Sequence, residues 1–293
     1  MTTPQIKPAQ PDDFRAIAKL IDQLNKYPQT QCLHSGEGAD SIYKQIIEYA
    51  GRNEIRFVLA EEDNQLIGVF GSEFDQQLGR GWLWGPFNPA RKGPSFMAEM
   101  LAELLKIIPT AITQIDSFLN QANTAGLQFY QQQGFEIIDT AHVYVALPPK
   151  TAPDIPKPCS IFSSLQTGSL ISLHEETFPQ AYETGQSMID KIDSEHQIFV
   201  CANSKMVQGY IYATVDSSAG EGYIDFLAVQ PQMRGQGTGK SLLLTASNWL
   251  FAKKQMPEVG LTVRDKLANA RALYEDVGFQ LKYSGVATRK HIK

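Results

Sequence analysis

The chain has 293 residues, of which 43% are hydrophobic and 19% charged, so it is long enough for two domains of ordinary size with proper cores. Its formal net charge of −5 lacks the basic excess of a nucleic-acid-binding surface. No apolar run reaches transmembrane length, and the opening MTTPQIKPAQPDD has no signal-like apolar core. We therefore expect a soluble cytoplasmic protein that binds neither nucleic acid nor membrane.

The first part of the chain alternates strand and helix patterns. A strand near Ile6 precedes a helix with one apolar stripe, and a hairpin follows a second helix. The later segments repeat the alternation. The expected order is strand near 6, helices 12–24 and 39–50, hairpin 57–70, strand 82–84, helix 96–107, strand 115–119, helix 124–133 and strand 137–147.

A proline-rich stretch divides the chain. LPPKTAPDIPKP, from Leu147 to Pro158, holds five prolines and can continue neither a helix nor an inner strand. We expect one domain at 1–147, a linker at 148–158 and a second domain at 159–293.

The second half repeats the order of the first. Its expected elements are a strand, helices 168–178 and 184–193, a hairpin at 198–211, strand 223–229, helix 239–254, strand 259–264, helix 267–277 and a final strand. The hairpins match between the halves, and FYQQQGF at 129–135 matches LYEDVGF at 273–279 at nearly the same offset. Two matches in one order indicate duplication, and each half predicts a mixed α/β sheet with flanking helices.

The stretch from Tyr223 to Phe251 predicts an anion site. A strand ends before Pro231, glycines alternate through a short loop, and apolar residues then recur at helical spacing. The start of a helix presents unpaired N–H groups and a partial positive charge, to which Arg234 and Lys240 add theirs. The ligand predicted here is a phosphate or pyrophosphate.

The spacing of the glycines narrows the choice among phosphate-containing ligands. A P-loop needs a glycine where Arg234 stands, and a dinucleotide fingerprint needs G-x-G-x-x-G, whereas this loop reads G-x-G-x-G. The arrangement R-x-x-G-x-G after L-A-V-x-P resembles the acetyl-CoA motif of the GCN5-related N-acetyltransferases. The resemblance covers both halves and is sharpest in the second. It implies two tandem domains of that fold, with acetyl-CoA as co-substrate.

By this resemblance, the loop binds the pyrophosphate and the preceding strand pairs with the pantetheine arm. The cofactor-binding residues would be Leu227, Ala228, Val229, Arg234, Gly235, Gln236, Gly237, Thr238, Gly239, Lys240 and Ser241. Where the family usually has an asparagine, this chain has Leu267, and Asn269 follows as its substitute.

Three residues are catalytic candidates. Tyr274 matches the family tyrosine that protonates the leaving thiolate, and the alternative is a core tyrosine. A backbone N–H near 227–229 would stabilise the developing oxyanion. Strand alternation places residues 221, 223, 225 and 227 on one face, so Glu221 or Asp225 is expected to act as base, directly or through water, or to bind a cationic acceptor.

Other residues carry weaker signals. The segment 174–182 lies where the family shapes its acceptor pocket, although its acidic residues also suit a solvated helix face. Cys32, Cys159 and Cys201 have neither metal nor disulfide spacing and are expected to be buried small residues. No H-E-x-x-H or paired-cysteine motif occurs, so we expect no metal site.

The first half departs from the motif. Its loop at 88–95 has one glycine, and Pro94 removes an N–H donor where donors are required. We expect a degenerate copy kept as scaffold or to shape the acceptor cleft.

These features predict an N-acetyltransferase that transfers an acetyl group directly from acetyl-CoA to an amine. The acceptor would be a small molecule or a peptide N-terminus, and the sequence leaves a homodimer open. The alternatives are a non-catalytic acyl-CoA-binding or sensing protein and an acyltransferase of thiol or cell-wall biosynthesis.

Overall fold

The computed structural model describes residues 4–36, 38–89, 92–151, 153–179, 181, 183–216, 220–265 and 268–292, without the side chains of 268 and 269. The chain forms two compact units. Unit 1 comprises Met1–Ala141 and Tyr283–Lys293, and unit 2 comprises His142–Lys282.

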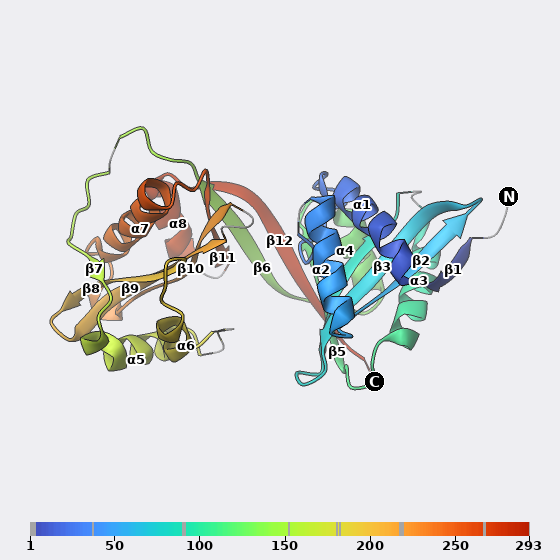
Figure 1. Cartoon of the computed structure of the whole chain (residues 1–293), viewed down its shortest axis with the longest axis horizontal. Helices are drawn as coiled ribbons and strands as arrows, with labels where there is room; N and C mark the ends of the chain where they lie inside the picture. The colour runs from blue at the N-terminus through green and yellow to red at the C-terminus, as the bar shows by residue number, and fades with distance from the viewer. Residues whose placement is uncertain are drawn as a thin grey trace. The chain divides into compact units, whose positions relative to one another are not determined.

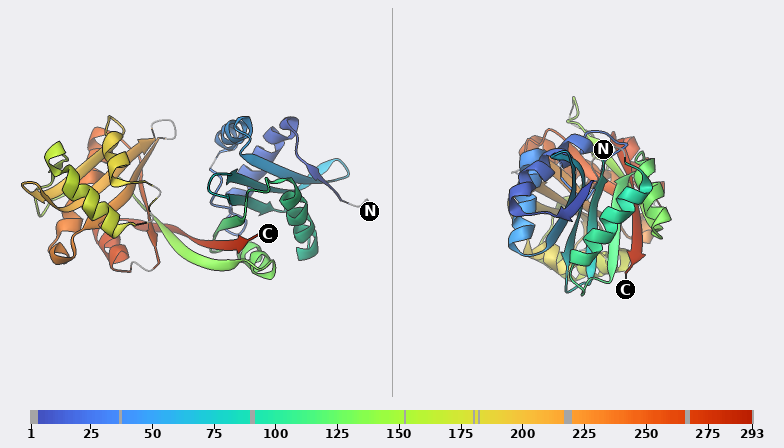
Figure 2. Two further views of the ribbon diagram at one scale, coloured as in Figure 1. Left: turned by 90° about the horizontal axis from the view of Figure 1, so that it is seen from below. Right: turned by 90° about the vertical axis from the view of Figure 1, so that its right-hand side faces the viewer.

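Unit 1 is a sheet with helices on both faces. Within it the strand order is β1-β2-β3-β4-β5-β12. Helices α1 and α2 (blue) lie on one face and α3 (green) on the other (Figures 1 and 2). The elements are β1 (Gln5–Pro8), α1 (Phe14–Asn25), α2 (Ala39–Gly51), β2 (Ile55–Glu62), β3 (Gln65–Asp75), β4 (Arg80–Phe87), α3 (Pro94–Ile107), β5 (Gln114–Asn120), α4 (Thr124–Gln132), β6 (Glu136–Ala146) and β12 (Gln280–His291).

Unit 2 has the same layers around two buried clusters, one for each face of its sheet. Its strand order is β6-β11-β10-β9-β8-β7. Leu242 and Leu243 of α7 pack on one face, and Leu170 of α5 packs on the other. The elements are β7 (Ser160–Ile161), α5 (Thr167–Thr177), α6 (Gly185–Asp190), β8 (His196–Asn203), β9 (Met206–Asp216), β10 (Glu221–Val229), α7 (Thr238–Asn248), β11 (Val259–Arg264) and α8 (Ala268–Val277).

The predicted order of elements is confirmed in both halves, because each follows from a local pattern of apolar residues. One helix differs in detail. The segment expected at 239–254 is α-helical over Thr238–Asn248 and continues as a π-helical turn over Trp249–Lys253.

The strand that closes each sheet comes from the other half of the sequence. Gly285–His291 of β12 pair antiparallel with Asn120–Gln114 of β5 inside unit 1. The last residues of β6, from His142 on, belong to unit 2. The structure thus divides the chain differently from domains at 1–147 and 159–293. Residues 148–158 contain no helix or strand among those described.

The expectation for two of the cysteines is wrong. Cys159 and Cys201 form a disulfide, with Cα atoms 4.6 Å apart, because β7 pairs with β8 and brings the two positions together. Cys32 is free and buried, as expected. Within the described part of the chain, no helix is long and apolar enough to cross a membrane, and no group of three or more His, Cys, Asp or Glu is arranged for a metal ion.

Candidate functional site

The site is built on a pair of parallel strands that separate. β10 pairs with β11 at Gly222–Ile224, and no pairing is seen beyond Ile224 among the described residues. On its other side β10 pairs with β9 along its whole length, with a bulge between Ile224 and Phe226. Residues 227–229 therefore lie on an edge of β10 that does not pair with β11 among the described residues. Unpaired backbone groups on such an edge need partners, which an extended ligand can supply.

The glycine loop follows directly and leads into α7. Gly235 has φ 71° and Gly237 has φ 81°, backbone conformations that favour glycine. A Cβ at either position would meet no atom within 4 Å, so the space beside the loop is open. Gly239 has a different role, because a Cβ there would lie 3.1 Å from Leu273 of α8. It lets α7 and α8 pack closely.

The two cationic side chains expected at the phosphate site, Arg234 and Lys240, both contact oxygens of the protein. The Arg234 Nε donates to the Val229 carbonyl at 3.1 Å, and the Lys240 ammonium lies 2.7 Å from Asp276 Oδ2. Both cations are therefore partly engaged by the protein. The open side of the loop is still lined by Gln236 and Gly237, both exposed, while Thr238 and Ser241 are buried on the inner side of α7.

A further cation comes from the linker. The backbone N–H of Lys157 donates to Ser241 Oγ at 3.0 Å, and its Nζ donates to Thr238 Oγ1 at 3.4 Å. An ammonium is thus held beside the first turn of α7. Lys157 is absent from the predicted set because this contact joins segments far apart in sequence, and no local motif signals it.

Tyr274 lies on α8 with most of its ring covered. It is 8% exposed, and the rings of Tyr144 and Phe279 each lie 6.2 Å away, centroid to centroid. Burial raises the pKa of Tyr274 to about 12, so the hydroxyl is protonated at neutral pH. That hydroxyl makes no hydrogen bond to any described residue. The Tyr274 hydroxyl is therefore protonated and donates to no described protein group, so it can donate its proton to a ligand.

Asp225 and Glu221 do not share a cleft. Asp225 is the extra residue of the β10 bulge, accepts a hydrogen bond from Thr214 Oγ1 at 2.7 Å and lines a pocket. Glu221 is exposed at the start of β10 and does not line that pocket. The bulge also reverses the alternation, because one added residue turns the next side chains over. Leu227 therefore packs against the α7 cluster instead of sharing a face with Asp225, which corrects the expected alternation.

The remaining predicted residues are placed as follows. Ala228 is buried with the α5 cluster, and Val229 packs on the α7 side. Leu267 and the side chain of Asn269 lie outside the described residues. His174 is buried, contacts the Tyr210 hydroxyl through Nδ1 and the Glu183 carbonyl through Nε2, and so joins α5 to β9 and to the segment before α6.

Unit 1 repeats the splayed strands and fills the opening. β4 pairs with β5 over Arg80–Trp82, and β3 and β4 have a bulge between Val69 and Gly71. The Tyr130 hydroxyl, at the position that matches Tyr274, donates to the Gly85 carbonyl at 2.6 Å and is fully buried. Burial raises the pKa of Tyr130 well above its usual value.

The loop before α3 is closed on itself. The Asn88 amide bonds both the N–H and the carbonyl of Lys92, and the Lys92 ammonium binds Glu62 at 2.8 Å. Ala90 and Arg91 lie outside the described residues. Asn123, the asparagine that this half retains, caps α4 by accepting from the Gly126 N–H at 3.0 Å.

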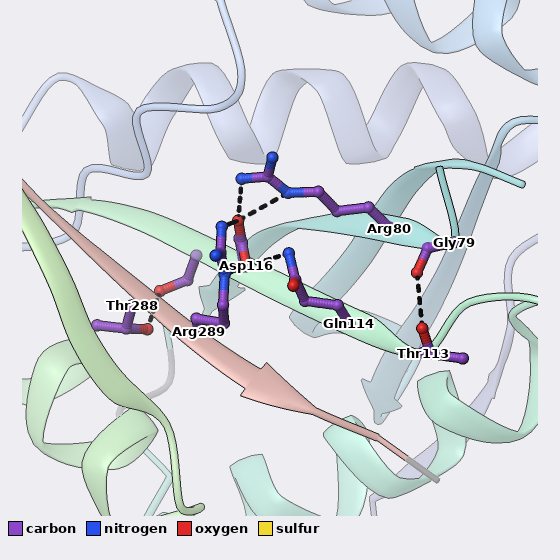
Figure 3. A network of polar contacts seen from close by, with 8 residues as sticks. Gly79, Arg80, Thr113, Gln114, Asp116, Thr288 and Arg289 are labelled. Atoms are coloured by element: carbon purple, nitrogen blue, oxygen red, sulfur yellow. Dashed lines mark hydrogen bonds and ion pairs between the residues drawn. The ribbon is translucent and has the colours of Figure 1, made fainter. Parts of the chain in front are cut away.

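An ion network holds unit 1 together where β4 and β5 begin to separate. Asp116 of β5 is contacted by Arg80 of β4 and by Arg289 of β12, and Gln114 lies beside them (Figure 3). Hydrogen bonds and charge from the two arginines lower the pKa of Asp116, against the effect of burial. The exchanged strand is therefore fixed in unit 1 by a charged pair as well as by its backbone ladder.

Comparisons with known proteins give the context of this geometry. Residues 167–279 match the acetyltransferase (GNAT) family. An SPbeta prophage-derived uncharacterized N-acetyltransferase of Bacillus subtilis is 23% identical over 134 residues, covering 44% of this chain and 74% of the relative. An uncharacterized N-acetyltransferase of Methanocaldococcus jannaschii is 29% identical over 119 residues, covering 41% and 75%.

Solved structures resemble the whole chain. A GCN5-related N-acetyltransferase from Sphaerobacter thermophilus is similar with a TM-score of 0.70, 19% identity and coverage of 99% of this chain and 96% of that one. A tandem GNAT protein from the clavulanic acid biosynthesis pathway has a TM-score of 0.64, 10% identity and coverage of 99% and 98%. The predicted fold class is thereby confirmed. These structures show the fold of the whole chain, and the family match places a domain of the acetyltransferase (GNAT) family at residues 167–279.

Proposed function

We propose that unit 2 is an acetyl-CoA-dependent N-acetyltransferase and that unit 1 is a second, degenerate copy of the same domain without a donor site. One observation carries the proposal. The edge of β10 at 227–229, beyond the pairing with β11, leads directly to the open glycine loop at the start of α7, and the Tyr274 hydroxyl on the neighbouring helix α8 has no hydrogen-bond partner among the described residues. An extended edge followed by a helix N-terminus suits a molecule with an amide-containing arm and a pyrophosphate.

The donor is proposed to bind along residues 227–229, with its pyrophosphate at the N–H groups of 235–241. Asn269 completes the proposed set. Lys157 and Arg234 add positive charge beside the phosphates, and α7 adds its partial charge. Acetyl is the acyl group that fits the family name most directly. The family itself supports acyl-CoA in general.

The transfer is proposed to be direct. The neutral amine attacks the thioester carbon, a C–N bond forms and the C–S bond breaks. The amine gives up one proton to Asp225 or to water held by it, and Tyr274 donates one to the departing thiolate. A backbone N–H of 227–229 would stabilise the oxyanion. Glu221 is dropped as a candidate base, because it does not line the Asp225 pocket.

Calorimetric titration of acetyl-CoA tests the donor site. We expect one site per chain in the wild type, loss of binding in Gly237→Trp and unchanged binding in Gly93→Trp. The control is matched in position and space, because Gly93 caps α3 as Gly237 caps α7 and both have open space around them, although only Gly237 has a positive φ. Thermal melts of both variants check folding. Two sites per chain, or loss of binding in the control alone, would contradict the proposal.

Release of free thiol from acetyl-CoA tests catalysis. We expect thiol release to depend on added amine and to fall in Tyr274→Phe. Donor binding without thiol release from any of a broad panel of amines would instead indicate an acyl-CoA-binding protein.

A further inference from the structure

A pocket lies on the face of the unit 2 sheet opposite α7. It opens where α6 and the start of β8 meet β9 and β10, and its volume is about 400 Å³. That volume is in the range of small-molecule sites. The residues that line it are Glu183, Lys191, Glu195, His196, Tyr212, Thr214, Val215, Asp216 and Asp225.

The lining is strongly acidic. It contains four carboxylates, from Glu183, Glu195, Asp216 and Asp225, and one lysine. The carboxylates and the lysine alone give the lining a formal charge of −3. Lys191 lies 2.6 Å from Glu183 Oε1, so its charge is already matched within the lining. A concave surface with this balance concentrates cations.

A second observation indicates that a ligand belongs here. Tyr212 is 1% exposed, and its hydroxyl has no hydrogen-bond partner among the described residues. Buried hydroxyls in folded proteins are nearly always paired with protein or water. Tyr212 forms part of the pocket wall, and an N–H group of a ligand can supply its missing partner.

We propose that this pocket binds the acceptor and that the acceptor is a diamine or polyamine. The inference rests on the proposed function, since Asp225 belongs both to the pocket and to the bulge where transfer is proposed. The nitrogen that attacks must be neutral at that moment, so its own charge cannot hold the acceptor in place. A second ammonium, bound near Glu195 and Asp216, retains its charge throughout. Tyr212 accepts a hydrogen bond from one of the two nitrogens.

The effect of charge is tested with three acceptors of similar length that differ in the charge of the second end group. They are 1,4-diaminobutane, n-butylamine and 4-aminobutanoate. Thiol release from acetyl-CoA gives kcat/KM for each, and calorimetry with CoA present gives the Kd. We expect kcat/KM for the diamine to exceed that for n-butylamine at least tenfold, and 4-aminobutanoate to be the poorest acceptor.

Variants of the lining residues test which side chains bind the second ammonium. Glu195→Gln with Asp216→Asn should lower kcat/KM for the diamine at least tenfold, about 1.4 kcal/mol, and leave n-butylamine unchanged. Glu258→Gln is the matched control, because Glu258 pairs with Lys282 outside the pocket. Tyr212→Phe should weaken diamine binding without lowering the melting temperature, since its hydroxyl has no described protein partner to lose.

The outcomes distinguish this inference from the proposed function. Equal turnover of all three acceptors, or no effect of the double variant, would overturn the diamine assignment and leave acetyl transfer intact. If no amine causes release of thiol from acetyl-CoA, the proposed acetyl transfer is contradicted. Calorimetry then tests whether the pocket binds a diamine. If the wild type binds the diamine and the double variant does not, the pocket is a diamine site. If the wild type does not bind the diamine, the assignment is overturned.

Discussion

Units 1 and 2 contain the same splayed strand pair and differ in what occupies the opening. In unit 1 Tyr130 donates to the Gly85 carbonyl, and the rings of Phe70, Phe129 and Phe135 surround it. In unit 2 the matching Tyr274 has no described partner for its hydroxyl. This backbone geometry alone therefore does not make a ligand site. A few side chains decide whether the opening is filled by the protein or left for a ligand.

The cations at the two helix starts show the same contrast. Lys92 before α3 is bound to Glu62, whereas Lys157 beside α7 contacts only neutral oxygens among the described residues. The lysine charge in unit 1 is thus neutralised by a carboxylate, whereas the lysine charge in unit 2 is available to an anionic ligand.

The largest effect should come from removing the Tyr274 hydroxyl. We expect Tyr274→Phe to lower kcat by about 10²–10⁴-fold with little change in the Kd for acetyl-CoA, because the hydroxyl is assigned to proton transfer. Folding stability should stay the same, since no described hydrogen bond is lost. Steady-state kinetics and thermal melts check both. A drop in melting temperature with unchanged kcat would assign Tyr274 to the core.

Tyr130→Phe should show the opposite behaviour. It leaves the Gly85 carbonyl without its buried donor, so we expect unit 1 to lose about 1–3 kcal/mol of unfolding free energy. Urea unfolding in a Trp249→Phe background reports on unit 1, where Trp82 and Trp84 lie. The kcat should not change. Unchanged stability would mean that the Tyr130 bond contributes nothing.

The comparison of the units can also be tested through pH with Glu73→Gln, because unit 1 has a half-buried carboxyl with no assigned role in donor or acceptor binding. Burial raises the pKa of Glu73 to about 7, while Trp84 Nε1 donates to it at 3.1 Å. The folded state holds this proton more tightly than the unfolded state. Stability therefore falls as pH rises from about 4.5 to about 7.

Glutamine keeps an acceptor for Trp84 and does not titrate. We expect Glu73→Gln to stabilise unit 1 by about 1–2 kcal/mol at pH 8 and to have no effect at pH 4. Urea unfolding at the two pH values, with the same tryptophan background, measures the difference. Equal effects at both values would show that the carboxyl charge is not the cause.

The smallest effect should come from Lys157→Met. Loss of one ammonium near the proposed phosphates should weaken acetyl-CoA binding about threefold to tenfold at low salt, and less at high salt. Lys92→Met serves as the control in unit 1 and should leave the Kd unchanged. Tighter binding by Lys157→Met would show that the linker obstructs the loop instead of assisting it.

Much of the fold was predictable, because hydrophobic periodicity and turn residues are local signals. The glycine loop and Tyr274 could be proposed as site residues from the sequence for the same reason, since each belongs to a contiguous motif. The Asp225 bulge was not, because alternation in sequence does not reveal one added residue, and so Leu227 was placed on the wrong face.

The acidic pocket and Lys157 required tertiary structure. The pocket lining comes from the residues on either side of α6 and from β8, β9 and β10, and no single segment carries its pattern. The exchange of β6 and β12 was equally hidden. Both strands follow a helix in similar sequences, and either pairing satisfies the same alternation of side chains.

The exchange makes unit 1 depend on residues made long after the rest of it. Arg289 and Asp116 are separated by 173 positions, and β5 meets its partner strand only across that interval. Contacts so distant in sequence form slowly and leave a strand edge exposed in the meantime. During synthesis, unit 2 would be mostly made before the sheet of unit 1 is closed. A fragment cut in the linker would lack the strand that pairs with β5 in this structure, so each half of the sequence needs a strand of the other to complete its sheet as observed.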